Sequence, residues 1–330
     1  MPKRDTDRQA EFLPRLESLR GLAAVSVVAY HSYGLRNDTV VTGMAPVVLF
    51  FVLSGFVLAR SLDRNPNPSR FFINRLFRLL PAAASTVLLL TFLHWRFGFV
   101  VGFEASFDAL NVLMNALMIR SDINGAMWSM TVECAASPLI LASFLAYQRF
   151  GARPLVSICV ILTACSSWGP YVHLLGGFTN LAPLYAFVVG VLVYCALRAE
   201  RISLIGYAAL AVTILIICGL RKQTAITILG ETLGSAALIY LIANNPKDRL
   251  FAILDTPPAR FIGRISYSFY LLHPIGLSLA ARSSDNWMFI FGLAVIFTLP
   301  MAWTFYVAIE QSFMKLGRLT TTAAPASNYA

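Results

Sequence analysis

The sequence is short of charged residues. Asp, Glu, Lys and Arg make up 13% of its 330 residues, whereas a soluble globular domain has about 25%. The chain therefore has too little charge to cover a water-facing surface. Hydrophobic residues make up 58% and the mean hydropathy is +0.69, which excludes a disordered chain, a coiled coil and a secreted disulfide scaffold. This composition predicts an exterior that lies mostly in lipid.

Cysteine and histidine are also scarce, with five and four residues. The cysteines lie in apolar runs without a C-x-x-C pair and are expected to behave as small hydrophobic residues. The histidines lack the spacing of metal ligands, so we predict neither a disulfide nor a metal site. Arg20 and His31 interrupt the apolar run that begins at Leu19, and no A-x-A cleavage site follows. We therefore predict an uncleaved first helix rather than a signal peptide.

Long apolar runs are what the sequence has in abundance. A membrane-spanning helix needs about 20 mostly apolar residues. The approximate spans are 18–35, 44–60, 79–97, 126–147, 154–172, 178–197, 202–220, 225–243, 262–281 and 286–308. We predict an all-α, polytopic membrane protein with about ten transmembrane helices.

The distribution of lysine and arginine supports this count. With the N-terminus in the cytoplasm, the inner segments hold 20 of these residues and the outer segments hold 6. Cytoplasmic loops carry such an excess, so an even number of spans with both termini cytoplasmic is expected. Apolar residues at helical spacing in Phe107–Ile119 predict a helix on the outer membrane surface. We expect residues 1–318 to form one membrane-embedded domain and 319–330 a disordered cytoplasmic tail.

Polar residues within the spans are candidate functional residues, because each is costly in lipid. Arg20 and His31 are about three helical turns apart and share a face of the first span. Glu133 ends the segment Trp128-Ser129-Met130-Thr131-Val132-Glu133 and lies at a depth compatible with a contact to His31. The alternative is a snorkelling arginine and a hydrogen-bonded core histidine.

Two further groups have helical spacing. Arg75 and Arg78 are one turn apart, and guanidinium groups bind phosphate well. We expect this pair to hold a phosphate-bearing donor at the inner boundary, with membrane anchoring as the alternative. Ser266, Tyr270 and His273 form one polar stripe, which should face the interior of the bundle or an aqueous cavity.

These groups together favour acyl transfer from a phosphate-bearing thioester to an external hydroxyl. His31 would be the general base, and a carboxylate would orient it. Glu310 is expected to pair with inner arginines. A flippase or acyl-group carrier is the alternative, since transporters also need buried charges. A non-catalytic assembly or sensor subunit is the third possibility.

Five segments then resemble motifs of acyltransferase family three, in the expected order. They are Arg20 to His31 (R-x(10)-H), Phe50–Phe56 (F-F-V-L-S-G-F), Arg75-x-x-Arg78 with Pro81, Trp128-Ser129 with Glu133 (W-S-L-x-x-E, here with Met130), and Ser266–His273 (S-Y-S-x-Y-L-x-H). The resemblance covers nearly the whole chain.

The resemblance implies a membrane-bound O-acyltransferase of the bacterial cytoplasmic (inner) membrane. Its donor would be cytoplasmic acyl-CoA, usually acetyl-CoA, and its acceptor a hydroxyl of a surface carbohydrate or lipid-linked glycan; no metal and no nucleic acid are expected. The implied roles are catalysis for His31 and Glu133, donor binding for Arg20, Arg75 and Arg78, and pocket lining for Trp128, Ser129, Ser266, Tyr267, Tyr270 and His273.

Two features depart from the family pattern. No esterase-like domain is expected after the last span, unlike in two-domain members. The segment Ile309-Glu310-Gln311-Ser312-Phe313 stands where many members have E-x-P-F, so the resemblance assigns no role to Glu310. The sequence predicts no oligomeric state.

Overall fold

The computed structural model is almost entirely helical. It describes residues 13–37, 44–101, 105–166, 172–174, 177–179, 183–197, 205–219 and 224–322. The elements are α2 (Leu13–Gly34), α3 (Met44–Arg64), α4 (Pro68–Phe97), α5 (Ala109–Ala116), η1 (Gly125–Met127), α6 (Trp128–Phe150), α7 (Arg153–Ser166), β1 (Val172–Leu174), β2 (Gly177–Thr179), α8 (Leu184–Cys195), α9 (Ile205–Gly219), α10 (Ala225–Asn244), η2 (Arg249–Asp255), α11 (Pro257–Ala280), α12 (Trp287–Phe305), the π-helix η3 (Tyr306–Glu310) and α13 (Gln311–Thr322).

The predicted class, a polytopic all-α membrane protein, is confirmed. Within the described residues, five helical segments are long and apolar enough to cross a membrane: Met44–Arg64, Pro68–Phe97, Gly125–Phe150, Ala225–Asn244 and Trp287–Thr321. Each of the ten predicted spans overlaps a described helix. Some of those helices are shorter than a span, and the polar residues of α2 lower its hydropathy. The count of ten and the cytoplasmic side of the termini therefore stay predictions.

Three predicted boundaries are wrong. The spans 154–172 and 178–197 are too long, because α7 ends at Ser166 and α8 begins at Leu184. Between those helices lie β1 and β2, which pair antiparallel with His173 opposite Phe178. Glycine and proline in this part of the sequence disfavour helix. The predicted tail 319–330 begins too early, since α13 continues to Thr322; residues 323–330 lie outside the description.

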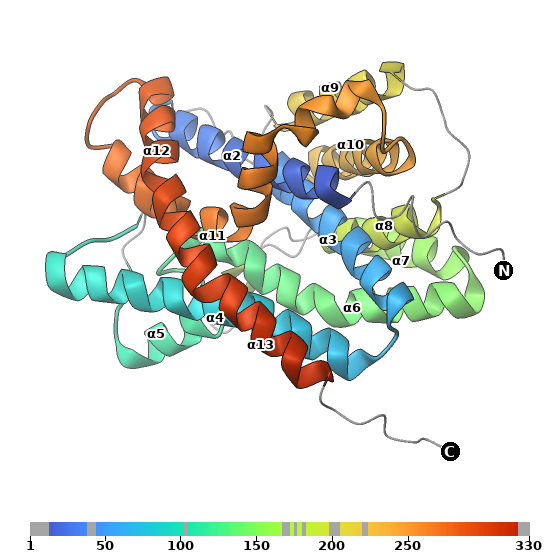
Figure 1. The fold of residues 1–330 in the computed structure, drawn as a ribbon, viewed down its shortest axis with the longest axis horizontal. Coiled ribbons are helices and arrows are strands. Elements are labelled where there is room, and N and C mark those ends of the chain that lie inside the picture. Colours follow the sequence, from blue (N-terminus) through green and yellow to red (C-terminus); the bar gives the residue numbers. More distant parts are fainter. Residues whose placement is uncertain are drawn as a thin grey trace.

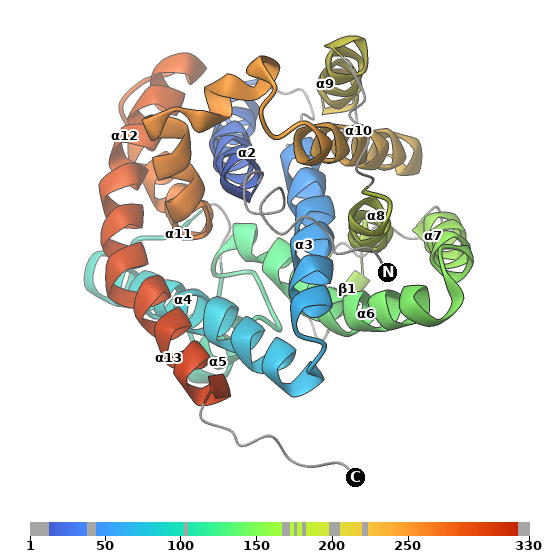
Figure 2. The same ribbon diagram turned by 45° about the vertical axis from the view of Figure 1, so that its right-hand side comes forward.

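The helices form three groups around a centre of α2 and α3, as Figures 1 and 2 show. Helices α11 and α12 lie on one side of this centre, and α7 to α10 lie on the other. Helices α4 and α6 run across one end of the centre, and α13 packs on α4. The largest cluster of buried side chains is built mainly from α3, α4, α6, α8 and α10.

Local signals fix the ends of α4, which carries two of the predicted site arginines. The Asn67 side chain accepts a hydrogen bond from the backbone N–H of Arg70, and Pro68 occupies the first turn. Both features are typical of helix starts. Gly98 ends the helix in a left-handed conformation with φ of 65°, which glycine adopts without strain.

Helices α3 and α8 cross with their backbones in contact. A Cβ atom on Gly55 would lie 2.0 Å from the carbonyl oxygen of Phe187, and one on Gly190 would lie 2.1 Å from that of Val52. Small residues allow such close approach between membrane helices. The F-F-V-L-S-G-F segment thus packs directly on α8.

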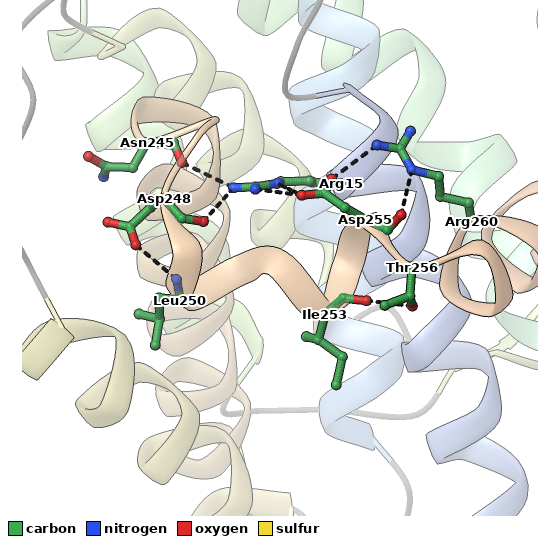
Figure 3. Close-up of polar contacts among 8 residues, drawn as sticks. All are labelled: Arg15, Asn245, Asp248, Leu250, Ile253, Asp255, Thr256 and Arg260. Carbon is green, nitrogen blue, oxygen red and sulfur yellow. Dashed lines mark hydrogen bonds and ion pairs between the residues drawn. The ribbon is translucent and has the colours of Figure 1, made fainter.

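A polar cluster joins the start of α2 to the connection between α10 and α11 (Figure 3). The Arg15 guanidinium donates to the Asp255 carboxylate at 2.5 and 2.9 Å and to the carbonyl oxygen of Asp248 at 3.0 Å. Arg260 donates to the other Asp255 oxygen at 3.0 Å. These segments, 1–20 and 244–264, are two that the charge pattern assigns to one side of the membrane.

A second ion pair joins two segments that the same pattern assigns to the opposite side. Arg36, after α2, lies 3.2 Å from Asp285 and also donates to the carbonyl oxygens of Ala281 and Ser284. The predicted helix within Phe107–Ile119 is present as α5, where Leu110 and Leu113 are exposed. Its position on the outer membrane surface stays a prediction.

Candidate active site

The close crossing of α2 and α11 positions Arg20, the first residue predicted to bind the acyl donor. A Cβ atom on Gly21 would lie 2.5 Å from the backbone nitrogen of Gly263, so the two helices meet there without side chains between them. Directly beside this crossing, Arg20 Nε donates to Ser266 Oγ at 2.9 Å. The two predicted site residues are therefore direct partners.

His31 lies farther along the same pair of helices and contacts His273. Its Nδ1 atom is 3.1 Å from His273 Nε2, and the two rings stack with centroids 5.2 Å apart. His273 is fully buried, and its own Nδ1 lies 2.6 Å from the carbonyl oxygen of Tyr270. His31 is only partly buried, whereas His273 is enclosed.

Glu133 binds Arg75 and not His31, so the expected contact between Glu133 and His31 is wrong. The carboxylate accepts from Arg75 Nη2 at 3.0 Å and from Ser54 Oγ at 2.9 Å, both at Oε1. Arg75 also donates to Ser137 Oγ at 2.8 Å. A buried carboxylate is stabilised far more by a guanidinium cation than by a neutral imidazole. The sequence placed Glu133 at a plausible depth but did not show which helix faces it.

A cavity of about 510 Å³ lies between these groups and the ends of α3, α4 and α13. One acidic residue, Glu133, lines it. Its wall includes seven arginines: Arg20, Arg60, Arg64, Arg70, Arg75, Arg78 and Arg318. Arg78 makes no hydrogen bond or ion pair with the described residues, whereas Arg75 is held by Glu133. The predicted pair thus divides into one bound and one available guanidinium.

Residues of the family motifs on α6 and α11 form the part of the cavity wall that lies nearest the histidine pair. Ser129 Oγ donates to the Tyr270 hydroxyl at 2.9 Å, and the Tyr270 hydroxyl donates to the carbonyl oxygen of Ala126 at 3.1 Å. The Tyr270 ring lies 5.4 Å from the ring of His273. His31 is not part of the cavity wall, so the histidine pair lies one aromatic ring beyond it.

The remaining predicted pocket residues have structural partners. Tyr267 donates to the carbonyl oxygen of Leu79 at 2.9 Å and faces the cavity. Trp128 is not in the cavity wall; its ring packs edge-to-face on Phe51, with centroids 6.2 Å apart. The start of α6 is fixed to α11 by Asn124, whose amide donates to the carbonyl oxygen of Leu271 at 2.9 Å.

Glu310 has a different partner from the one expected. It is buried in the π-helix between α12 and α13 and accepts from Ser268 Oγ at 2.7 Å. The expected ion pair with an inner arginine is wrong, since none occurs within the described part of the chain. A π-bulge often marks a functional site, and this one aims the carboxylate at the middle of α11.

Sequence reasoning missed several polar residues. Arg60, Arg64, Arg70 and Arg318 were counted as orientation signals, yet all four line the cavity. Arg60, Arg64 and Arg70 lie near helix ends and close to Arg75 and Arg78 in the sequence, which was the available signal; Arg318 carried no such signal. Glu231 of α10 was also missed; it is 2% exposed, and its Oε2 makes no hydrogen bond within the described residues. Those residues contain no group of three or more histidine, cysteine or acidic side chains able to hold a metal ion.

Comparison with known proteins identifies the family. The family model described as an acyltransferase domain, Acyl_transf_3, matches residues 13–309. The chain belongs to acyltransferase family 3. The matched region extends from the first described helix into the π-helix. It includes both histidines of the pair and every arginine of the cavity wall except Arg318. The chain is accordingly an O-acyltransferase.

Its relatives carry names of the same class. A protein of Komagataeibacter xylinus named as a membrane-bound transacylase, BcsY, is 27% identical over 82% of this chain and 75% of its own length. A protein of Staphylococcus aureus strain COL named as an O-acetyltransferase is 23% identical over 94% of this chain and 58% of its own.

Coverage of the relatives differs. The chain spans less than two thirds of the staphylococcal protein. The peptidoglycan O-acetyltransferase OatA of Listeria monocytogenes is 34% identical over 86 residues, which are 24% of this chain and 13% of that protein. No solved structure matches the chain.

Proposed function

We propose that this acyltransferase moves an acyl group, acetyl in the simplest case, from cytoplasmic acyl-CoA to a hydroxyl of an exported or surface carbohydrate. The single observation that carries the proposal is the cavity with seven arginines and one carboxylate, which ends one ring away from a histidine pair. The arginines of this arrangement can bind an anionic donor, and a histidine can act as the base for a hydroxyl. The enzyme is proposed to lie in the bilayer of the bacterial cytoplasmic membrane, with both termini in the cytoplasm.

The donor site is proposed at the arginines. Coenzyme A carries a diphosphate and a separate phosphate, and guanidinium groups bind phosphate through paired hydrogen bonds. Arg78, Arg70 and Arg64 have side chains that make no hydrogen bond with the described residues, so they are the proposed phosphate ligands. Arg20 is held by Ser266 nearer the histidines, where it would meet the other end of the donor. Arg75 supports the wall through Glu133.

The reaction needs one base and one leaving thiol. His31 takes the proton of the acceptor hydroxyl, and the oxygen attacks the carbonyl carbon of the thioester. The carbon–sulfur bond breaks, and the thiolate of coenzyme A takes the proton from His31. No further oxidant, reductant or metal enters this balance. The Tyr270 ring, which packs on Phe50 at 5.6 Å and on His273 at 5.4 Å, separates the cavity from the histidine pair.

The acceptor class is proposed from the relatives. One is named for peptidoglycan and others as O-acetyltransferases, so a carbohydrate hydroxyl is the proposed acceptor. His31 lies near the end of α2 at which Arg36 pairs with Asp285, opposite the end held by Arg15. An acceptor would therefore approach from the outer side and the donor from the inner side.

The test uses purified full-length protein in lipid nanodiscs with radiolabelled acetyl-CoA. Thiol release that depends on an added glycan acceptor, and label on that glycan, are expected. His31→Ala should abolish both, while His94→Ala, a histidine away from the cavity, should leave both unchanged. Label that enters sealed vesicles without joining any acceptor would contradict the proposal and indicate a carrier. Unchanged activity of His31→Ala would remove His31 from the mechanism.

A further inference from the structure

His273 is a buried imidazole with two defined contacts. It lies on α11, is fully buried, and each ring nitrogen has a partner. Its Nδ1 is 2.6 Å from the carbonyl oxygen of Tyr270. A carbonyl oxygen can only accept a hydrogen bond, so the proton of this contact must be on Nδ1 of His273.

The proton on Nδ1 decides the role of the other nitrogen. A neutral imidazole carries one N–H and one lone pair, so His273 Nε2 is an acceptor. The atom 3.1 Å away is Nδ1 of His31, which must then be the donor. In its neutral form His31 therefore carries its proton on Nδ1 and its lone pair on Nε2.

The surroundings favour the neutral form of His273. The ionisable side chains whose rings contact it are His31 and Tyr270. Helix α12, which packs on α11, has no ionisable residue between Trp287 and Phe305, and α3 has none before Arg60. Glu133, on α6, is committed to Arg75. A second proton on His273 would create a buried cation with no carboxylate in contact.

We propose that His273 is a positioning residue that fixes the tautomer and orientation of His31, with Nε2 of His31 as the atom that takes the hydroxyl proton. This inference rests on the proposed function. In the usual arrangement a carboxylate orients the catalytic histidine; here the backbone carbonyl of Tyr270 and a second imidazole do so in series. When His31 Nε2 takes the proton, the bond from its Nδ1–H to His273 becomes charge-assisted and stronger.

The experiment compares two replacements of similar size at position 273. Gln offers a side-chain oxygen that can accept from His31 Nδ1, whereas Leu removes the acceptor. We expect His273→Leu to lower kcat on the order of 100-fold, the scale of one misplaced general base, with KM for acetyl-CoA unchanged. In the wild type the acceptor at position 273 stabilises the protonated form of His31. His273→Leu removes this stabilisation, so the acid limb of the kcat profile should move to lower pH. His273→Gln should restore much of kcat and the position of the limb.

Two results overturn the inference. One is a wild-type kcat in His273→Leu. The other is equal loss in the Leu and Gln variants with an unmoved acid limb, which would indicate a packing role alone. Failure of the proposed function is separate, because it shows as no thiol release by the wild type or as full activity of His31→Ala. Unaltered acetyl-CoA affinity by calorimetry shows that each variant is folded.

Discussion

The Arg75 guanidinium of α4 and the Glu133 carboxylate of α6 form a 3.0 Å ion pair, and Ser54 of α3 donates to the same carboxylate oxygen. The side chains of the pair are 8% and 18% exposed. Removing one partner of a buried pair leaves an uncompensated charge, which costs about 3–5 kcal/mol. The pair therefore couples three helices that form the cavity wall.

Replacement of Glu133 should first affect stability. We expect Glu133→Gln to lower the free energy of unfolding by about 3 kcal/mol, measured by thermal unfolding in detergent. The double variant Arg75→Met, Glu133→Leu should lose less than the sum of the two single changes, because no unpaired charge remains. A Glu133→Gln protein with wild-type stability and a kcat as low as that of His31→Ala would instead place the carboxylate in catalysis.

Loss of Arg78 should weaken donor binding. Its guanidinium faces the cavity without a hydrogen bond to the described residues, so Arg78→Ala removes a phosphate ligand without breaking an internal contact. We expect KM for acetyl-CoA to rise about tenfold, which corresponds to about 1.4 kcal/mol, with a smaller change in kcat. The matched control is Arg96→Ala, at the other end of the same helix and outside the cavity. An equal rise in KM for both variants would show a general effect of charge.

The contact between α3 and α8 predicts a glycine that cannot be replaced. A Cβ on Gly55 would collide with the backbone of Phe187, and over-packing of this kind costs about 1–3 kcal/mol or more. We expect Gly55→Ala to lower the unfolding temperature and to reduce activity by displacing Ser54. Gly292→Ala is the control, because a Cβ there has no atom within 4 Å. Its stability should stay the same or rise by up to about 1 kcal/mol.

Helical periodicity and hydropathy predicted much of the fold. Apolar runs of span length located the helices, and polar residues within or next to those runs, namely Arg20, Arg75, Arg78 and Tyr270, line one cavity. These signals are local, since each depends on residues within a few turns of one helix. The boundaries failed where glycine and proline interrupt an apolar run, as between α7 and α8.

Pairing between helices was not predictable from one sequence. Depth along the membrane made Glu133 a suitable partner for His31, but two residues at one depth can lie on opposite sides of a bundle. The crossing of α4 with α6 brings Arg75 to Glu133, and the crossing of α2 with α11 brings His273 to His31. His273 was predicted as part of a polar stripe and of the pocket lining, and its contact with His31 depends on the Gly21–Gly263 crossing.

The Arg15–Asp255 contact predicts stability that depends on acidity (Figure 3). The hydrogen bond from Arg15 lowers the pKa of Asp255 from its ordinary value of 3.8. A carboxyl group with a lowered folded-state pKa adds stability above its unfolded pKa and loses it as the pH falls through the folded value. We expect Asp255→Asn to destabilise the protein at pH 7 on the order of 1 kcal/mol, since water screens the 37% exposed carboxylate.

The difference between wild type and Asp255→Asn should shrink as the pH falls below about 4, because the wild-type carboxyl then becomes neutral as well. Thermal unfolding of both proteins at several pH values measures this convergence. Asp285→Asn is the control, because it makes the same change of charge in an ion pair whose carboxylate is 96% exposed. It should leave stability unchanged at every pH. A constant difference for Asp255→Asn across the range would mean that the side chain acts through shape and not through its charge.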